Sequence, residues 1–174
     1  MGMRLRPCVA AGLAGWIGLA GVAAGDGGLA GFLAEDGQLR AELRVRDGQH
    51  GMVGETGTLW VIEPSGAYRV SSFINQEIGP PQREGTLSAE QLERLAEILS
   101  SQDFAHLPPR IDETAQANPR VISVAFGRHS ATLVLPPGPP GDLDQLIAGQ
   151  AGEAGPRGRL LAVVDAVLEV TAAE

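Results

Sequence analysis

The stretch TLWVIEPSGAYRVSSFIN, residues 58–75, predicts the centre of a β-sheet. Two runs rich in β-branched and aromatic residues, 58–63 and 67–75, flank Pro64-Ser65-Gly66. Proline presets the φ angle of a turn, and glycine supplies a positive φ at low cost. We therefore expect the two runs to pair as an antiparallel hairpin.

An amphipathic helix is predicted immediately downstream, over residues 89–101. Ser88 and Gln91 have the spacing of a capping box, in which each side chain bonds the other residue's backbone N–H. The apolar face that should pack on the sheet consists of Leu92, Leu95, Ala96, Ile98 and Leu99. One more helical turn should follow in 102–109, with Asp103 as its cap and Phe104 and Leu107 buried.

The remaining elements follow from alternation and spacing. Alternating residues predict a strand over 39–45, with a helix left open, and a second hairpin over 120–126 and 130–135. A short piece, 83–87, can pair at a sheet edge, and a helical turn can form over 143–148. After a linker over 149–158, the apolar spacing favours a closing helix over 159–171, although its valines also suit a strand. The predicted fold is α+β: an antiparallel sheet of about five strands with a central amphipathic helix and a C-terminal helix on one face.

The N-terminus has the layout of a secretory signal peptide over residues 1–24. Arg4 and Arg6 precede an uncharged run of eighteen residues that ends in small side chains. An uncleaved membrane anchor is the alternative. We expect a flexible tether over 25–38, a single domain over 39–174, and a periplasmic or extracellular location, with no membrane association after cleavage.

Composition excludes several chemistries. The net charge is −8, and removal of 1–24 would make it −10, since that segment holds two arginines and none of the 21 acidic residues. This sign disfavours nucleic acid as a partner. The chain has no lysine, and its only cysteine, Cys8, lies in the predicted leader, so lysine-based catalysis is excluded and a thiolate nucleophile would be lost on cleavage.

No catalytic, metal or cofactor motif is present. His50, His106 and His129 lack the spacing of metal ligands. Asp103 and His106 can share a helix face, yet an exposed histidine at a helix end is the simpler interpretation. A Ser-His-Asp set assembled only in space remains a possible hydrolase site. We predict no cofactor, no metal and no enzymatic activity.

Two loops are the candidate binding elements. Residues 47–57 carry four glycines around Met52 and Val53, which predicts a mobile loop with an apolar tip, and residues 110–119 form a second loop. We expect a binding module that contacts an unknown protein or cell-envelope partner through these loops, with Met52 and Val53 as contact residues.

Three segments together resemble known proteins: the glycine-rich loop after the first strand, TLSAEQLERLAEILSSQDFAHLPP, and the hairpin VISVAFGRHSATLVLP. They look like small exported bacterial α+β proteins of no assigned function. They are also distantly similar to the emfourin family of protease inhibitors, over roughly residues 39–136. The matching positions are Gly51-Met52-Val53-Gly54 and the group Asp103, Phe104, Leu107 and Pro108. The resemblance implies inhibition of a thermolysin-type metalloprotease as an alternative function.

Overall fold

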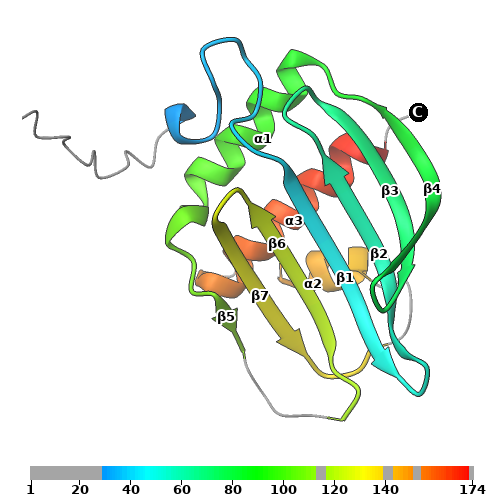
Figure 1. Cartoon of the computed structure of the whole chain (residues 1–174). Helices are drawn as coiled ribbons and strands as arrows, with labels where there is room; N and C mark the ends of the chain where they lie inside the picture. Colours follow the sequence, from blue (N-terminus) through cyan, green and yellow to red (C-terminus); the bar gives the residue numbers. More distant parts are fainter. Residues whose placement is uncertain (1–28, 113–116, 139–142, 151–153, 173–174) are drawn as a thin grey trace, which may run out of the picture.

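The computed structural model describes residues 29–112, 117–138, 143–150 and 154–172. These residues form one layer of β-sheet and one layer of helices (Figure 1). The predicted signal peptide, 1–24, lies outside the described residues. The α+β class is confirmed, but the sheet has seven strands instead of about five.

The strand order in the sheet is β4-β3-β2-β1-β6-β7-β5. All neighbouring strands pair antiparallel except β5 and β7, which are parallel. The strands are β1 (Leu43–Gly51), β2 (Gly54–Ile62), β3 (Ala67–Ile74), β4 (Glu77–Thr86), β5 (Arg110–Ile111), β6 (Arg120–Phe126) and β7 (His129–Leu135). Both predicted hairpins are confirmed, and Gly66 adopts the positive φ expected of it, at 89°.

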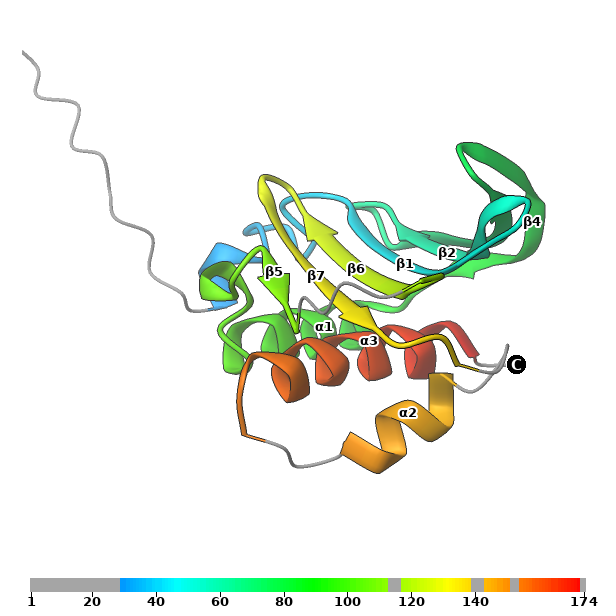
Figure 2. The same ribbon diagram turned by 90° about the horizontal axis from the view of Figure 1, so that it is seen from below.

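Three helices, α1 (Ala89–Ser101), α2 (Leu143–Gln150) and α3 (Pro156–Ala172), lie on one side of the sheet (Figure 2). Helix α1 has the predicted capping box between Ser88 and Gln91. It buries the predicted apolar stripe, with only Ile98 left partly exposed. A 3-10 turn, η2 (Phe104–His106), follows α1, and both Phe104 and Leu107 are buried as predicted.

The predicted closing helix is confirmed and begins earlier than expected. Pro156 is its first residue, where the missing N–H costs nothing and the fixed φ suits a helix. Its valines do not make it a strand, because α3 is buried along most of its length against the sheet and the other helices. The range predicted as a linker, 149–158, is therefore partly helical at both ends.

The first strand is wrong in its predicted position. We expected a strand over 39–45 and a mobile loop over 47–57, but β1 runs to Gly51 and β2 begins at Gly54. The glycines are there because the two strands approach closely: a Cβ on Gly57 would lie 1.9 Å from the backbone oxygen of Asp47. Hydrogen bonds to β2 and β6 on either side of β1 outweigh the low strand propensity of glycine.

The range predicted as a flexible tether, 25–38, is part of the folded domain where it is described. Residues 29–31 form a 3-10 turn, η1 (Leu29–Gly31), and Phe32 is buried against Phe126 with ring centroids 5.4 Å apart. Leu39 is also buried, and its N–H donates to the carbonyl of Pro64 at 3.0 Å. The glycine and alanine content concealed a segment that docks through a few large side chains.

Strand β4 forms one edge of the sheet and is longer than the predicted piece 83–87. Its Pro80-Pro81 pair is tolerated because an edge strand has no second neighbour to bond. The register shifts twice between β3 and β4, and the two strands curl away from the helices (Figure 2). The curl buries a small second cluster, Leu59, Val61 and Phe73, with the Arg46 guanidinium 3.7 Å above the Phe73 ring.

Candidate functional site

Met52 and Val53 form the two-residue turn between β1 and β2 and are the most exposed large hydrophobic residues described. Their relative exposures are 105% and 74%. Gly54 takes a φ of 102°, which lets the chain reverse at this point. The prediction that the tip is apolar and accessible is confirmed, but the tip is a strand-supported turn and not a loose loop.

The turn is braced by Asn75, which follows β3. The backbone N–H of Glu55 donates to the Asn75 side-chain oxygen at 3.0 Å, and the Asn75 amide donates to the Val53 carbonyl at 3.4 Å. Arg46 donates to the Asn75 carbonyl at 2.7 Å and to the Glu55 carboxylate at 2.8 Å. These bonds tie β1, β2 and β3 together at the turn, which fixes the direction of Met52 and Val53.

Two further exposed apolar residues lie at the same end of the sheet. Ile74 ends β3 and Ile78 is the second residue of β4, with exposures of 55% and 59%. The register places Ile74 opposite Thr56, close to the β1–β2 turn. We call Met52, Val53, Ile74 and Ile78 the apolar end. The register puts Ile74 and Ile78 on opposite faces of the sheet, so the β1–β2 turn, with Met52 and Val53 at its tip, is the candidate contact surface of this end.

The second predicted loop, 110–119, contacts the last residues of β1 through Asn118 and Pro119. The Gln49 amide donates to the Asn118 carbonyl at 2.5 Å, and the His50 N–H donates to the Pro119 carbonyl at 3.0 Å. The structure therefore brings part of this loop beside the end of β1. Its first two residues instead form β5, the other edge of the sheet, and residues 113–116 lie outside the described residues.

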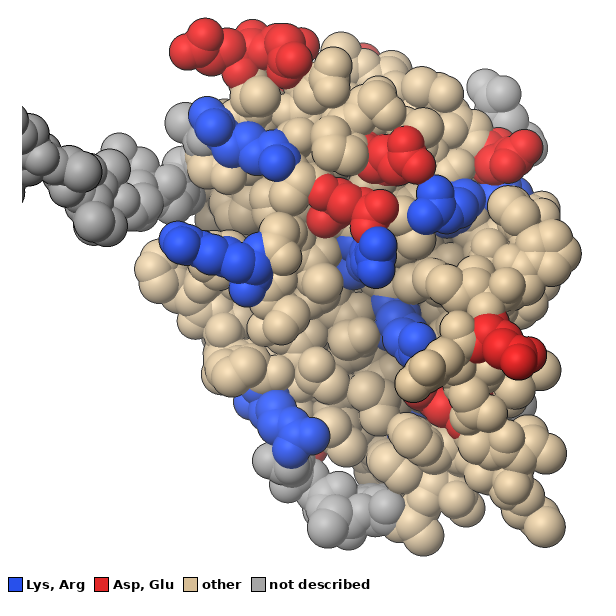
Figure 3. All heavy atoms as spheres, in the orientation of Figure 1, with Lys and Arg blue, Asp and Glu red and all other residues tan. Residues whose placement is uncertain are grey.

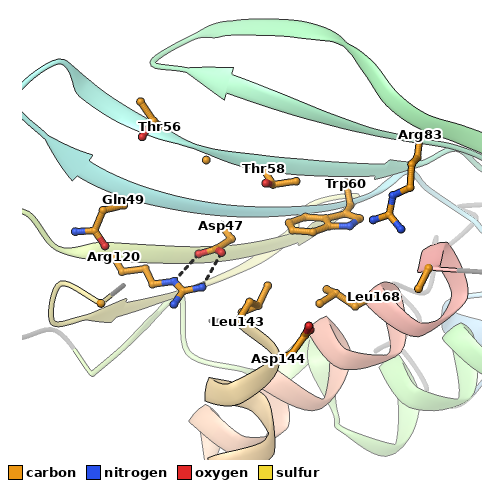
Figure 4. A pocket seen from close by; sticks show the side chains of 13 residues that line it. Asp47, Gln49, Thr56, Thr58, Trp60, Arg83, Arg120, Leu143, Asp144 and Leu168 are labelled. Atoms are coloured by element: carbon orange, nitrogen blue, oxygen red, sulfur yellow. Dashed lines mark hydrogen bonds and ion pairs between the residues drawn. The ribbon is translucent and has the colours of Figure 1, made fainter. Parts of the chain in front are cut away.

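A cavity of about 580 Å³ lies between the sheet and helices α2 and α3 (Figure 4). This volume falls in the range of small-molecule sites, about 300–1,000 Å³. The sheet supplies polar side chains and one aromatic ring, and the helices supply mostly apolar ones. The lining includes Asp47, Gln49, Thr56, Thr58, Trp60, Arg83 and Arg120 from the sheet and Leu143, Asp144 and Leu168 from the helices.

Asp47 and Arg120 form a bidentate ion pair in the wall of this cavity. Nε and Nη2 of Arg120 each donate to one Asp47 oxygen at 2.8 Å. The Arg120 side chain is 8% exposed and that of Asp47 is 16% exposed, so this charge-assisted pair is largely buried. The pair links β1 to β6 and fixes one side of the cavity.

Sequence reasoning missed this cavity, although one signal was present. The alternation that predicted a strand points Leu43 and Val45 inward, and continuing it two residues further places Asp47 on the same face. A carboxylate on a buried face requires a partner. The partner, Arg120, is 73 residues away in the chain, and nothing local identifies it.

The histidines do not come together in the described structure. His50 is the next-to-last residue of β1 and His129 begins β7, at opposite ends of the sheet according to the strand register. His106 Nδ1 lies 2.6 Å from Asp103 Oδ1, with both side chains exposed, at 67% and 48%. In the described ranges, no group of three or more His, Cys, Asp or Glu side chains is arranged to hold a metal.

Asp103 does not cap the short turn as predicted. It adopts a left-handed φ of 50°, and its side chain makes no capping hydrogen bond. The carboxylate turns instead to His106 and to Arg159 of α3, whose Nη1 is 3.7 Å away. Tertiary contact with α3 therefore outweighs the local capping preference of aspartate.

Charged residues of both signs are spread over the sheet face that the helices leave uncovered (Figure 3). This face includes the exposed ion pairs Arg44–Glu42 and Arg69–Glu63. Such a mixed surface lacks the basic stripe that a nucleic-acid interface needs. None of the described helices has the length and hydropathy needed to span a bilayer.

The comparisons with known proteins assign no family. Searches of protein-family models and of curated proteins found no match to this chain. The similarity to emfourin inhibitors therefore stays a prediction from the quoted segments.

Proposed function

We propose that the chain is an exported, non-enzymatic binding module that captures a protein or cell-envelope partner through its apolar end. The observation that carries this proposal is the braced turn that presents Met52 and Val53 to solvent. Exposed apolar side chains on a rigid support bind with little loss of conformational entropy. The carbonyls of Asn118 and Pro119 accept hydrogen bonds from Gln49 and His50 on the strand that leads into this turn.

Removing the two apolar side chains tests the proposal. The double variant Met52→Gly, Val53→Ser should weaken partner capture from an exported fraction by about a hundredfold or more, since each buried apolar side chain contributes roughly 1.5–3 kcal/mol. The matched control is Leu29→Ser, which removes an exposed apolar residue of 45% exposure at the opposite end of the domain. Equal capture by the double variant and the wild type would exclude the apolar end as the binding surface.

Protease inhibition is the second candidate, and the same turn favours it. A narrow two-residue turn held by Asn75 and Arg46 has the shape and stiffness needed to enter a cleft and place Met52 or Val53 in a specificity pocket. Stoichiometric mixing with a thermolysin-class metalloprotease should then abolish peptide hydrolysis. Full residual activity of the protease at a several-fold excess of the chain would end this candidate.

A further inference from the structure

We infer that the cavity between the sheet and helices α2 and α3 binds a small amphipathic anion, a molecule with one negatively charged group and a single apolar chain or ring. This site is distinct from the apolar end and its partner. Trp60 is 7% exposed, and its indole Nε1 is buried without a hydrogen-bond acceptor among the described residues. A buried N–H donor that lacks an acceptor is costly, and an acceptor atom on a ligand would satisfy it.

The guanidinium of Arg83 supplies a positive charge to the cavity lining. Its Nη1 donates to the Thr171 carbonyl near the end of α3, at 3.0 Å, and no carboxylate pairs with it in the described part of the chain. The register aligns Trp60 on β2, Val70 on β3 and Arg83 on β4 in one row across the sheet. Figure 4 shows the indole and the guanidinium on the same, sheet wall of the cavity.

The other charges of the cavity direct the anionic group toward Arg83. Asp47 and Arg120 neutralise each other, as described above. Asp144 lies on the opposite, helical wall (Figure 4), so it repels an anion from that side. The Arg83 charge and the indole N–H, which has no acceptor among the described residues, therefore both lie on the sheet wall, where a carboxylate or sulfonate can accept from them.

The apolar part of the ligand is placed by the rest of the lining. The Trp60 ring forms the sheet wall between Thr58 and Arg83, and Leu143 and Leu168 face it from α2 and α3 (Figure 4). An alkyl chain or aromatic ring between these three side chains would be shielded from water, while the charged head group stays at Arg83. The volume of about 580 Å³ accommodates one such molecule.

Calorimetric titration of the full chain with decanoate tests this inference. We expect saturable binding of one equivalent, and Arg83→Gln should weaken it by about tenfold or more, the size of one charge-assisted hydrogen bond. Trp60→Phe keeps an aromatic ring but removes the indole N–H, and should weaken binding severalfold. The matched control, Arg44→Gln, removes the same charge from the uncovered face of the sheet and should bind as the wild type does.

A second variant keeps the test decisive if Arg83→Gln loosens α3. Thr58→Phe fills the cavity from β2 without altering Arg83 or its bond to Thr171, and should abolish decanoate binding while the thermal unfolding curve shows a folded protein. The inference is overturned if decanoate does not saturate, if Thr58→Phe binds as the wild type does, or if the cation decyltrimethylammonium binds equally well. Partner capture by the apolar end is measured separately, so the two proposals fail independently.

Discussion

The two ends of the sheet differ in how their apolar residues are used. At the end where β6 turns into β7, residues 29–41 fold over the sheet, and Phe32, Leu39 and Phe126 are all buried. At the other end, the β1–β2 and β3–β4 turns expose Met52, Val53, Ile74 and Ile78.

The β6–β7 turn itself shows what an ordinary turn of this fold contains. It consists of Gly127 and Arg128, a glycine with a φ of 57° and a charged residue. Nothing in hairpin geometry therefore requires Met and Val at the β1–β2 turn. The comparison teaches that one end is built for stability and that the other bears apolar residues which stability does not explain.

The largest effect should come from breaking the packed end. Phe32→Ala removes a buried ring that packs on Phe126, and should lower the free energy of unfolding by about 3–5 kcal/mol in guanidinium denaturation. Leu29→Ala, three residues earlier and exposed, should change it by less than about 0.5 kcal/mol. Similar losses for both variants would mean that 29–38 does not unfold with the domain.

Breaking the buried Asp47–Arg120 ion pair should have the next largest effect. Asp47→Asn removes the carboxylate that accepts two hydrogen bonds from the buried Arg120 guanidinium, and should cost about 3 kcal/mol in the same measurement. The control is Glu63→Gln, which breaks the exposed pair with Arg69 and should cost less than about 1 kcal/mol. If the two variants lose equal stability, the cavity wall is more hydrated than its burial indicates.

The smallest effect concerns Asp165, on α3. Burial, followed by the nearby carboxylates Glu169 and Asp144, raises the pKa of Asp165, and Arg94 opposes this only in part. The folded state thus holds the Asp165 proton more tightly than the unfolded chain does. The free energy of unfolding therefore falls as the pH rises from the pKa of Asp165 in the unfolded chain through its higher pKa in the folded state. Asp165→Asn should be slightly more stable than the wild type at neutral pH, and the gain should vanish below about pH 4. A gain that does not change with pH would contradict this assignment.

The local part of the fold was predictable from sequence. The capping box at Ser88 and Gln91, the glycine of the β2–β3 turn and the burial of Phe104 and Leu107 all depend on residues within a few positions of one another. These signals are short-range, so one chain segment contains them completely. The positions of Met52 and Val53 at an accessible tip were predictable for the same reason.

The wrong predictions concern residues whose conformation depends on a strand or helix that is distant in the sequence. Gly48 and Gly57 favour a loop when read alone, and become strand residues because β1 and β2 face each other there. Asp103 favours a cap when read alone, and turns instead toward α3. The cavity has the same origin, since Asp47, Trp60, Arg83 and Arg120 come from four different strands.

The sequence by itself determined the α+β class, the two central hairpins, the amphipathic helix and the apolar turn at Met52 and Val53, because periodicity, capping and turn chemistry act over short distances. The tertiary structure alone decided that the glycine-rich range 47–57 is a braced hairpin, that Phe32 belongs to the core, and that the buried Asp47–Arg120 pair and the Trp60 indole line one cavity. Those features depend on hydrogen bonds and packing between residues far apart in the chain, which no local pattern encodes.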